Sequence, residues 1–196
     1  NGQTVGHGLS QAPQWIMLKA RDATQNWRVW HHKLATDGSK RLLLDSTNAS
    51  EDASFLNDTA PTSTVFTLGN ADDAWNVNSA KFIAYCWHEV PGFSKFGSFT
   101  GNGNDNGTYV NLGFRPAWLM VKSSSNSNTN FTILDNKRNT FNVTNARLFA
   151  NDNEAESVSG SGVGSVDFLS NGFKARDSHV DGNGGGNSYI YMAFAR

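Results

Sequence analysis

The residues that could perform acid–base or nucleophilic chemistry are poorly spaced for it in this chain. Its glutamates are Glu51, Glu89, Glu154 and Glu156. Glycoside hydrolysis needs two carboxyl groups about 5 to 10 Å apart across a sugar, and no stretch that looks like a strand carries an alternating acidic pair. Nucleophile-elbow, zinc-helix and phosphate-loop motifs do not occur in the sequence. We therefore predict no catalytic residues.

The histidines and the single cysteine point the same way. His31 and His32 are adjacent, and neighbouring strand residues face opposite sides of a sheet, which disfavours a shared metal. Cys86 excludes an intrachain disulfide and is expected to be a small buried side chain. A polysaccharide lyase or hydrolase stays open as an alternative, and it requires Arg28, His31 and Tyr85 to converge in one cleft.

Oxygen-rich loops suggest a calcium site instead. The segment 177–186 holds Asp177, Asp181 and Asn183 among four glycines. Calcium takes six to eight oxygen ligands, which carboxylates, amides and loop carbonyls supply. Asn, Asp and Gly are also the ordinary residues of turns. These three residues are our candidate ligands for a Ca²⁺ ion that the fold does not require.

Aromatic and amide side chains also suggest a carbohydrate site. An exposed tryptophan ring can stack on a sugar face while neighbouring polar groups hold its hydroxyls. Trp75 is the best surface candidate, because it has no aromatic counterpart elsewhere in the chain. The predicted glycan-binding residues are Trp75, Trp30, His31, Asp73 and Asn76. Trp15, Trp118, Trp27 and Trp87 are expected to lie in the core.

Short apolar runs must position these residues. Residues 14–19, 27–30, 65–68, 82–87 and 93–103 are rich in aromatic and branched side chains and are bounded by Gly, Asn, Asp or Ser. Such runs are typical of strands. No segment has the apolar spacing of an amphipathic helix. The sequence predicts an all-β protein.

The strongest pattern is an internal repeat. Residues 12–19 (APQWIMLK) match 115–122 (RPAWLMVK), and 81–87 (KFIAYCW) match 188–194 (SYIYMAF). Phe66 corresponds to Phe173, and further matches keep the same order. We therefore expect two tandem copies of one concanavalin-like or jelly-roll β-sandwich repeat.

The strand expected at 93–103 has no counterpart before residue 3 in the first copy. Residues 1–90 are thus expected to form a first repeat that lacks its initial strand, with residues 91–196 as a second repeat packed closely on it. The sequence does not begin with Met and shows no signal peptide, so we expect a mature or excised piece of a longer chain.

Composition excludes two classes of partner. Charged residues make up 17% of the 196 residues and the formal net charge is −1, which argues against a nucleic-acid binder that needs a basic face. No apolar run approaches the length of a membrane span, so membrane insertion is not expected.

Several segments resemble a repeated domain of phage tail-fibre-like and other virion-associated proteins, especially those of marine phages. They are 113–122 (GFRPAWLMVK), 96–103 (FGSFTGNG), 167–174 (DFLSNGFK) and 189–194 (YIYMAF). The resemblance covers nearly all of the second copy and, more loosely, the first. It implies a lectin-like, concanavalin-type sandwich in a long appendage protein and brings no catalytic residues with it.

These observations combine into one hypothesis. The chain is expected to be a non-enzymatic structural and adhesive module on a virion surface or another extracellular appendage. Its expected partners are a host-surface polysaccharide or glycan and neighbouring repeats or further copies of itself. A purely structural repeat, completed by a neighbouring strand, is the alternative within the structural class.

Overall fold

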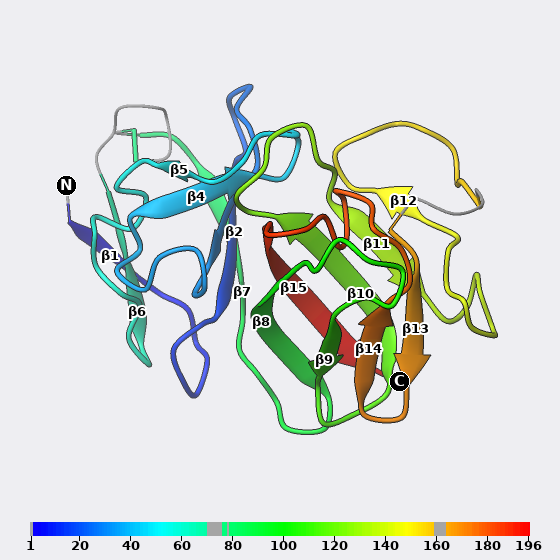
Figure 1. The fold of residues 1–196 in the computed structure, drawn as a ribbon. Coiled ribbons are helices and arrows are strands. Elements are labelled where there is room, and N and C mark those ends of the chain that lie inside the picture. Colours follow the sequence, from blue (N-terminus) through cyan, green and yellow to red (C-terminus); the bar gives the residue numbers. More distant parts are fainter. Residues whose placement is uncertain (1, 70–75, 78, 159–163) are drawn as a thin grey trace. The chain divides into compact units, whose positions relative to one another are not determined.

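The chain divides into two compact units, which are described separately. The structure is a computed structural model that describes residues 2–69, 76–77, 79–158 and 164–196 (Figure 1). Unit 1 comprises Asn1–Asp45 and Ser50–His88, and unit 2 comprises Ser46–Ala49 and Glu89–Arg196. The change from one unit to the other falls close to the boundary expected from the repeat. The assignment of the short segment Ser46–Ala49 to unit 2 is not visible in the sequence.

All regular structure in the described ranges is β, which confirms the predicted class. In unit 1 the strands are β1 (Gln3–Gly6), β2 (Trp15–Ala20), β3 (Arg28–His31), β4 (Lys40–Leu43), β5 (Glu51–Asp52), β6 (Val65–Leu68) and β7 (Phe82–Trp87). In unit 2 they are β8 (Ser94–Thr100), β9 (Tyr109–Asn111), β10 (Pro116–Ser123), β11 (Thr132–Asp135), β12 (Leu148–Phe149), β13 (Val166–Leu169), β14 (Gly172–Ala175) and β15 (Ser188–Ala195). Among the described residues there is no helix that could cross a membrane.

Unit 1 pairs a larger and a smaller antiparallel sheet. The larger sheet has the order β5-β4-β3-β2-β7, and the smaller consists of β1 and β6. One face of the larger sheet and the inner side of the smaller one share a hydrophobic core. Its buried members are Ile16, Leu18, Trp30, Phe55, Leu56, Phe66 and Leu68. This two-layer arrangement is consistent with a β-sandwich.

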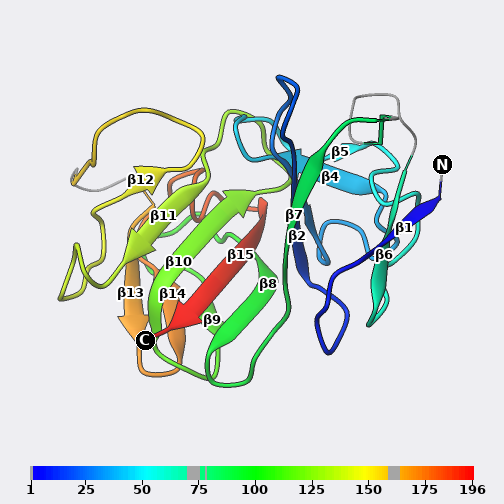
Figure 2. The same ribbon diagram turned by 180° about the vertical axis from the view of Figure 1, so that it is seen from behind.

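Unit 2 has the same two-layer plan with more strands. The larger sheet has the order β12-β11-β10-β15-β8, and the smaller has the order β13-β14-β9. In Figures 1 and 2, which view the molecule from opposite sides, β13, β14 and β9 lie on one face of the sheet that contains β10 and β15. The buried core between the layers is formed by Val110, Leu112, Phe114, Leu119, Val121, Leu134, Val166, Phe168, Phe173, Tyr189, Tyr191 and Ala193.

The period-2 alternation of side chains explains which residues enter these cores. On β15, Tyr189, Tyr191 and Ala193 face the core of unit 2, while Ile190 and Met192 lie on the opposite side of the strand. On β7 the corresponding inward residues are Phe82, Ala84 and Cys86. The strand predicted at 65–68 matches β6, and that at 82–87 matches β7.

Candidate functional site

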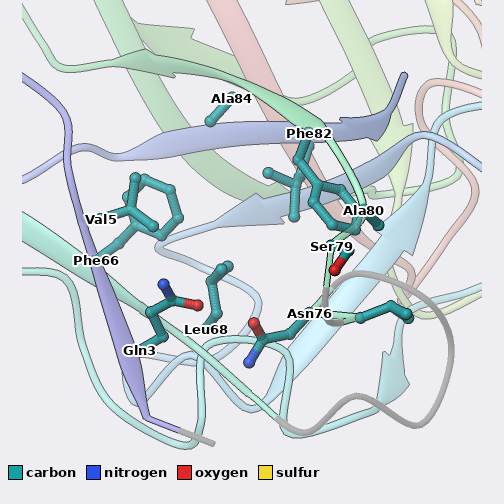
Figure 3. Close-up of a pocket in the computed structure, with 11 residues that line it drawn as sticks. Gln3, Val5, Phe66, Leu68, Asn76, Ser79, Ala80, Phe82 and Ala84 are labelled. Atoms are coloured by element: carbon teal, nitrogen blue, oxygen red, sulfur yellow. The ribbon is translucent and has the colours of Figure 1, made fainter. Parts of the chain in front are cut away.

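A pocket of about 560 Å³ opens between the two sheets of unit 1 (Figure 3). Its described lining consists of Gln3, Val5, Leu18, Phe66, Leu68, Asn76, Val77, Ser79, Ala80, Phe82 and Ala84. Strands β1 and β6 form one wall, and β2 and β7 form the other. Because both walls are formed by strands, paired β-structure fixes the positions of the residues that line the pocket. Its volume is within the range of small-molecule and side-chain binding sites.

The lining combines apolar side chains with three polar ones, of which Gln3 lies on β1 and Asn76 and Ser79 lie on the segment before β7. None of the described lining residues carries a charge, so the pocket suits an apolar or neutral group. Gln3, Asn76 and Ser79 supply the polar groups, and Asn76 Nδ2 already donates a hydrogen bond to the carbonyl oxygen of Gly69, at 3.0 Å. The lining favours binding of a neutral group over acid–base chemistry.

A row of aromatic rings lies on the opposite face of β7. Tyr85 stacks between Trp27 and Trp87, with centroid distances of 6.1 Å to each ring and interplanar angles of 29° and 21°. Tyr85 is 42% exposed, and both tryptophans are half-buried. Trp27 and Trp87 were expected in the core from their aromatic counterparts, so this expectation is wrong. We call Trp27, Tyr85 and Trp87 the aromatic row.

Two of the predicted sugar-binding residues are buried. Trp30 faces the core of unit 1 and donates from Nε1 to the carbonyl oxygen of Ala35, although it also contributes to the wall of a second pocket of about 350 Å³. His31 is fully buried, and its Nδ1 accepts a hydrogen bond from the Lys33 amide at 3.0 Å. The expectation that Trp30 and His31 are exposed is therefore wrong. β3 lies between β4 and β2, and all four of its residues are buried, so both of its faces are covered.

The other three predicted sugar-binding residues lie close together in the sequence, and one of them, Asn76, lies among the described residues. Trp75 and Asp73 lie outside the described residues. Asn76 lies at the pocket of unit 1. The sequence therefore indicated one residue of the pocket, but it did not indicate Phe66, Phe82 or Ala84, whose significance depends on how β6 and β7 come together.

The enzymatic alternative required Arg28, His31 and Tyr85 to converge. Arg28 pairs across the sheet with Leu18, whose side chain faces the core, and His31 pairs with Trp15. These two positions have opposite parity on β3, so the two side chains lie on opposite faces of the sheet. The Arg28 guanidinium reaches the Gln25 side chain and the Asn26 carbonyl group. The cleft that this alternative needs is not formed by these residues.

The candidate calcium ligands are buried hydrogen-bond acceptors in a well-fastened loop. Asp177 accepts from the Ser165 amide and hydroxyl and, through its other oxygen, from the His179 amide at 2.9 Å. Asp181 Oδ1 accepts from the Asn130 amide at 2.7 Å. These contacts give both carboxylates a structural role.

Asn183 joins the same loop to the turn after β8. Its Nδ2 donates to Asn102 Oδ1, to the Asn104 carbonyl and to the Asp177 carbonyl, at 2.8–2.9 Å. Within the described ranges no group of three or more His, Cys, Asp or Glu side chains is placed to hold a metal ion. Calcium binding by Asp177, Asp181 and Asn183 stays a prediction.

A buried lysine in unit 2 has no equivalent among the sequence-based candidates. Lys122 Nζ donates to Thr129 Oγ1 at 2.6 Å, to the Thr129 carbonyl at 2.9 Å and to the Thr47 carbonyl at 3.2 Å. Burial lowers its pKa to about 8, against a smaller opposing effect of Asp181. These bonds tie Ser46–Ala49 to unit 2, so we assign Lys122 a structural role.

Comparison with known families places the chain as a whole. Searches of curated proteins and of solved structures found no match. The model of one family, described as a domain of unknown function (DUF7483), matches residues 1–196. The pocket, the aromatic row and the two-sheet units are therefore features of a chain that belongs to the DUF7483 family.

Proposed function

We propose that this chain is a non-enzymatic structural and adhesive module of a virion tail fibre or a similar extracellular appendage. In this proposal units 1 and 2 are two copies of one concanavalin-like, jelly-roll-type repeat. Its adhesive surface binds a host-surface polysaccharide or glycan. The observation that carries the adhesive part is the exposed aromatic row of unit 1, formed by Trp27, Tyr85 and Trp87.

The repeat relation is supported by matching strand orders. In unit 1 four consecutive strands of the larger sheet run β4-β3-β2-β7, and in unit 2 four consecutive strands run β12-β11-β10-β15. The smaller sheets match as well, because β1 pairs with β6 and β9 pairs with β14. Trp15 lies across from Trp87, as its counterpart Trp118 lies across from Phe194. Strand order and sequence match agree for six strands of each unit, which supports the proposed repeat, whereas β5, β8 and β13 have no counterpart among the described strands.

The adhesive part follows from the chemistry of stacked rings. Aromatic faces on a sheet surface provide a flat apolar platform, which suits the C–H face of a sugar ring. Tyr85 also carries a hydroxyl group that can bond to a sugar hydroxyl. Binding by one such platform is weak, so adhesion relies on many copies along an appendage.

A glycan array with matched tyrosine variants tests this proposal. Tyr85→Ala is expected to weaken binding about tenfold, which corresponds to loss of on the order of 1.4 kcal/mol. Tyr109→Ala is the control, because Tyr109 is an equally exposed tyrosine of unit 2 at 43%. Trp75→Ala tests the original surface candidate in the same assay.

A folded sample that binds no glycan would overturn the adhesive part and leave the structural module. Release of reducing ends or of unsaturated sugars from a bound polysaccharide would overturn the non-enzymatic part. Equal losses for Tyr85→Ala and Tyr109→Ala would remove the aromatic row from the proposal.

A further inference from the structure

We propose that the outer edge of β7, together with the pocket of unit 1, is an acceptor site for an extended polypeptide strand of the β8 type. The inference rests on the proposed repeat relation between the units, but it does not depend on glycan binding. It assigns the pocket a partner of defined chemistry: an extended peptide segment with an inward-facing phenylalanine.

The backbone of β7 offers the hydrogen-bonding groups that such a strand needs. β2 pairs with one side of β7, and no strand in the described part of the chain pairs with the other. The Arg21 amide donates a hydrogen bond to the Lys81 carbonyl, so Lys81 and every second residue after it turn their backbone groups toward β2. In an antiparallel pair alternate residues turn their amide and carbonyl groups outward. On β7 these residues are Phe82, Ala84 and Cys86.

Unit 2 shows what occupies this position when a neighbour is present. On β15, Tyr189, Tyr191 and Ala193 correspond to Phe82, Ala84 and Cys86. They lie across from Phe99, Gly97 and Lys95 of β8. The ladder parity is the same, because the Ala195 amide donates to the Phe93 carbonyl. β8 therefore uses the backbone groups of β15 whose counterparts on β7 lack a strand partner among the described residues.

The pocket of unit 1 corresponds to the place of one β8 side chain. In unit 2 the Phe99 ring contacts the rings of Phe173, Tyr189 and Tyr191, with centroid distances of 5.7, 5.0 and 6.5 Å. The counterparts of these three residues in unit 1 are Phe66, Phe82 and Ala84. All three line the pocket, and they are labelled in Figure 3. An inserted strand would place its own aromatic side chain there.

The lining also indicates what the inserted strand carries next to that ring. In unit 2 a Cβ atom on Gly97 would overlap the Tyr191 ring, so that position is restricted to glycine. In unit 1 Tyr191 is replaced by Ala84, which leaves room for a larger side chain. The partner strand is therefore expected to accept small apolar residues where β8 has Gly97.

A polypeptide fits the combined surface better than a free small molecule does. The pocket could hold many apolar groups, but the outward amides and carbonyls of β7 are spaced for a second backbone. Sheet edges of this kind are natural sites of strand addition. The two features coincide on one strand, since Phe82 and Ala84 contribute both a wall of the pocket and part of the edge.

Cys86 provides a built-in reporter of the strand register. It is the single cysteine of the chain, and its counterpart Ala193 lies across from Lys95 of β8. We would incubate the intact chain at pH 9 with a peptide of residues 93–101 carrying Lys95→Cys as an activated disulfide. The control peptide carries Ser98→Cys, which lies on the other face. Burial raises the pKa of Cys86 to about 11, so the alkaline buffer is needed.

The proposal predicts that the Lys95→Cys peptide captures Cys86 about tenfold more than the Ser98→Cys peptide. Adding Phe99→Ala to the Lys95→Cys peptide should abolish the preference. Equal capture by all peptides, while a small methanethiosulfonate labels Cys86, would overturn the proposal.

A second measurement requires no covalent bond. With excess unmodified peptide, hydrogen exchange at the Phe82, Ala84 and Cys86 amides should slow, and unchanged exchange would overturn the strand site. Since no sugar is involved, a positive glycan array beside a negative peptide result leaves the adhesive proposal intact, and the reverse result leaves the strand proposal intact.

Discussion

The last strands of the two units, β7 and β15, occupy matching places in their sheets but differ in exposure. Ile83 and Tyr85 on β7 are 38% and 42% exposed, whereas their counterparts Ile190 and Met192 on β15 are 1% and 4% exposed. β15 lies between β10 and β8, and β7 is paired only with β2 among the described strands. The outward-facing side chains are thus exposed on the strand with one described neighbour and buried on the strand with two.

Unit 1 has a pocket where two aromatic rings pack in unit 2. In unit 2, two large rings, Tyr191 from β15 and Phe99 from β8, pack in the corresponding space. Unit 1 has Ala84 in place of the first and no described strand that supplies the second. Both differences enlarge the space between the sheets. The pocket is thus a consequence of strand content and of one side-chain substitution.

Removing the β8 ring should give the largest effect, because it makes unit 2 resemble unit 1. Phe99→Ala is expected to lower the free energy of unfolding by about 2–4 kcal/mol, because the ring packs on three aromatic neighbours. The loss stays below that of a fully buried phenylalanine because the ring is half-buried. Chemical denaturation measures the change. Phe141→Ala, at a side chain that is 83% exposed, should stay within about 0.5 kcal/mol of the wild type. Similar losses for both variants would contradict the packing comparison.

Exchanging Ala84 for the tyrosine of unit 2 tests whether this residue sets the size of the side chain that the pocket accepts. Wild-type chain should capture the Lys95→Cys peptide and its Gly97→Val derivative about equally, because Ala84 leaves space beside that position. In the Ala84→Tyr variant the Gly97 peptide should still be captured, and the Gly97→Val peptide should be captured about tenfold less because of overpacking. The yield of the mixed disulfide measures the capture of each peptide by each protein. A variant that accepts both peptides equally would show that Ala84 does not set the specificity.

The buried lysine of unit 2 predicts a smaller, pH-dependent difference. The pKa of Lys122 falls from 10.5 to about 8 in the folded chain. Between these values the unfolded state binds more protons, so this residue adds stability as the pH rises from 8 to 10.5. The stability of the wild type relative to Lys122→Met should therefore increase between pH 7.5 and pH 10, by on the order of 1 kcal/mol.

Thermal melts of both proteins at the two pH values measure this difference. Comparing the two proteins removes the opposing effect of Cys86, which is the same in both. Because burial raises the pKa of Cys86 from 9.0 to about 11, its contribution to the stability of the fold falls as the pH rises through this range. A difference that stays flat or falls with pH would show that Lys122 is not desolvated in the folded chain.

Calcium should have the smallest effect. The oxygens of Asp177 and Asp181 already accept hydrogen bonds from Ser165, His179 and Asn130. These hydrogen bonds occupy oxygens that a Ca²⁺ ion would need, so we expect the melting temperature to differ by less than about 1 °C between excess Ca²⁺ and chelator. A bound ion would raise the melting temperature by linkage. A rise of several degrees with Ca²⁺ would instead favour the predicted metal site.

Much of the strand content could be predicted from local patterns. The runs that became β6 and β7 have alternating apolar side chains between turn residues, and the repeated Pro-x-Trp pattern predicted β2 and β10. The repeat also predicted that no strand of unit 1 corresponds to β8, and none of its described strands does. These features depend on neighbours in sequence, which is why sequence alone reveals them.

The site could be predicted only in part, because its residues come from distant segments. Asn76 was selected, but Phe66 and Phe82 form a pocket only when β6 and β7 lie on opposite walls. Trp30 was taken for a surface residue because it stands near polar residues in sequence, yet its strand is buried on both faces. Tyr85 was noticed only as a possible catalytic group, since its stacking on Trp27 depends on sheet pairing.

The most direct test of the account is to supply the neighbouring strand in cis. Residues 93–105 would be placed directly before Asn1, where Asn1-Gly2 corresponds to Asn106-Gly107 in the repeat. We predict a melting temperature about 3–6 °C higher, as expected for 1–2 kcal/mol in a chain of this size, with slowed amide exchange in β7. The same extension with Phe99→Ala should lose most of this gain. An extended chain with an unchanged melting temperature and unprotected β7 amides would contradict the account.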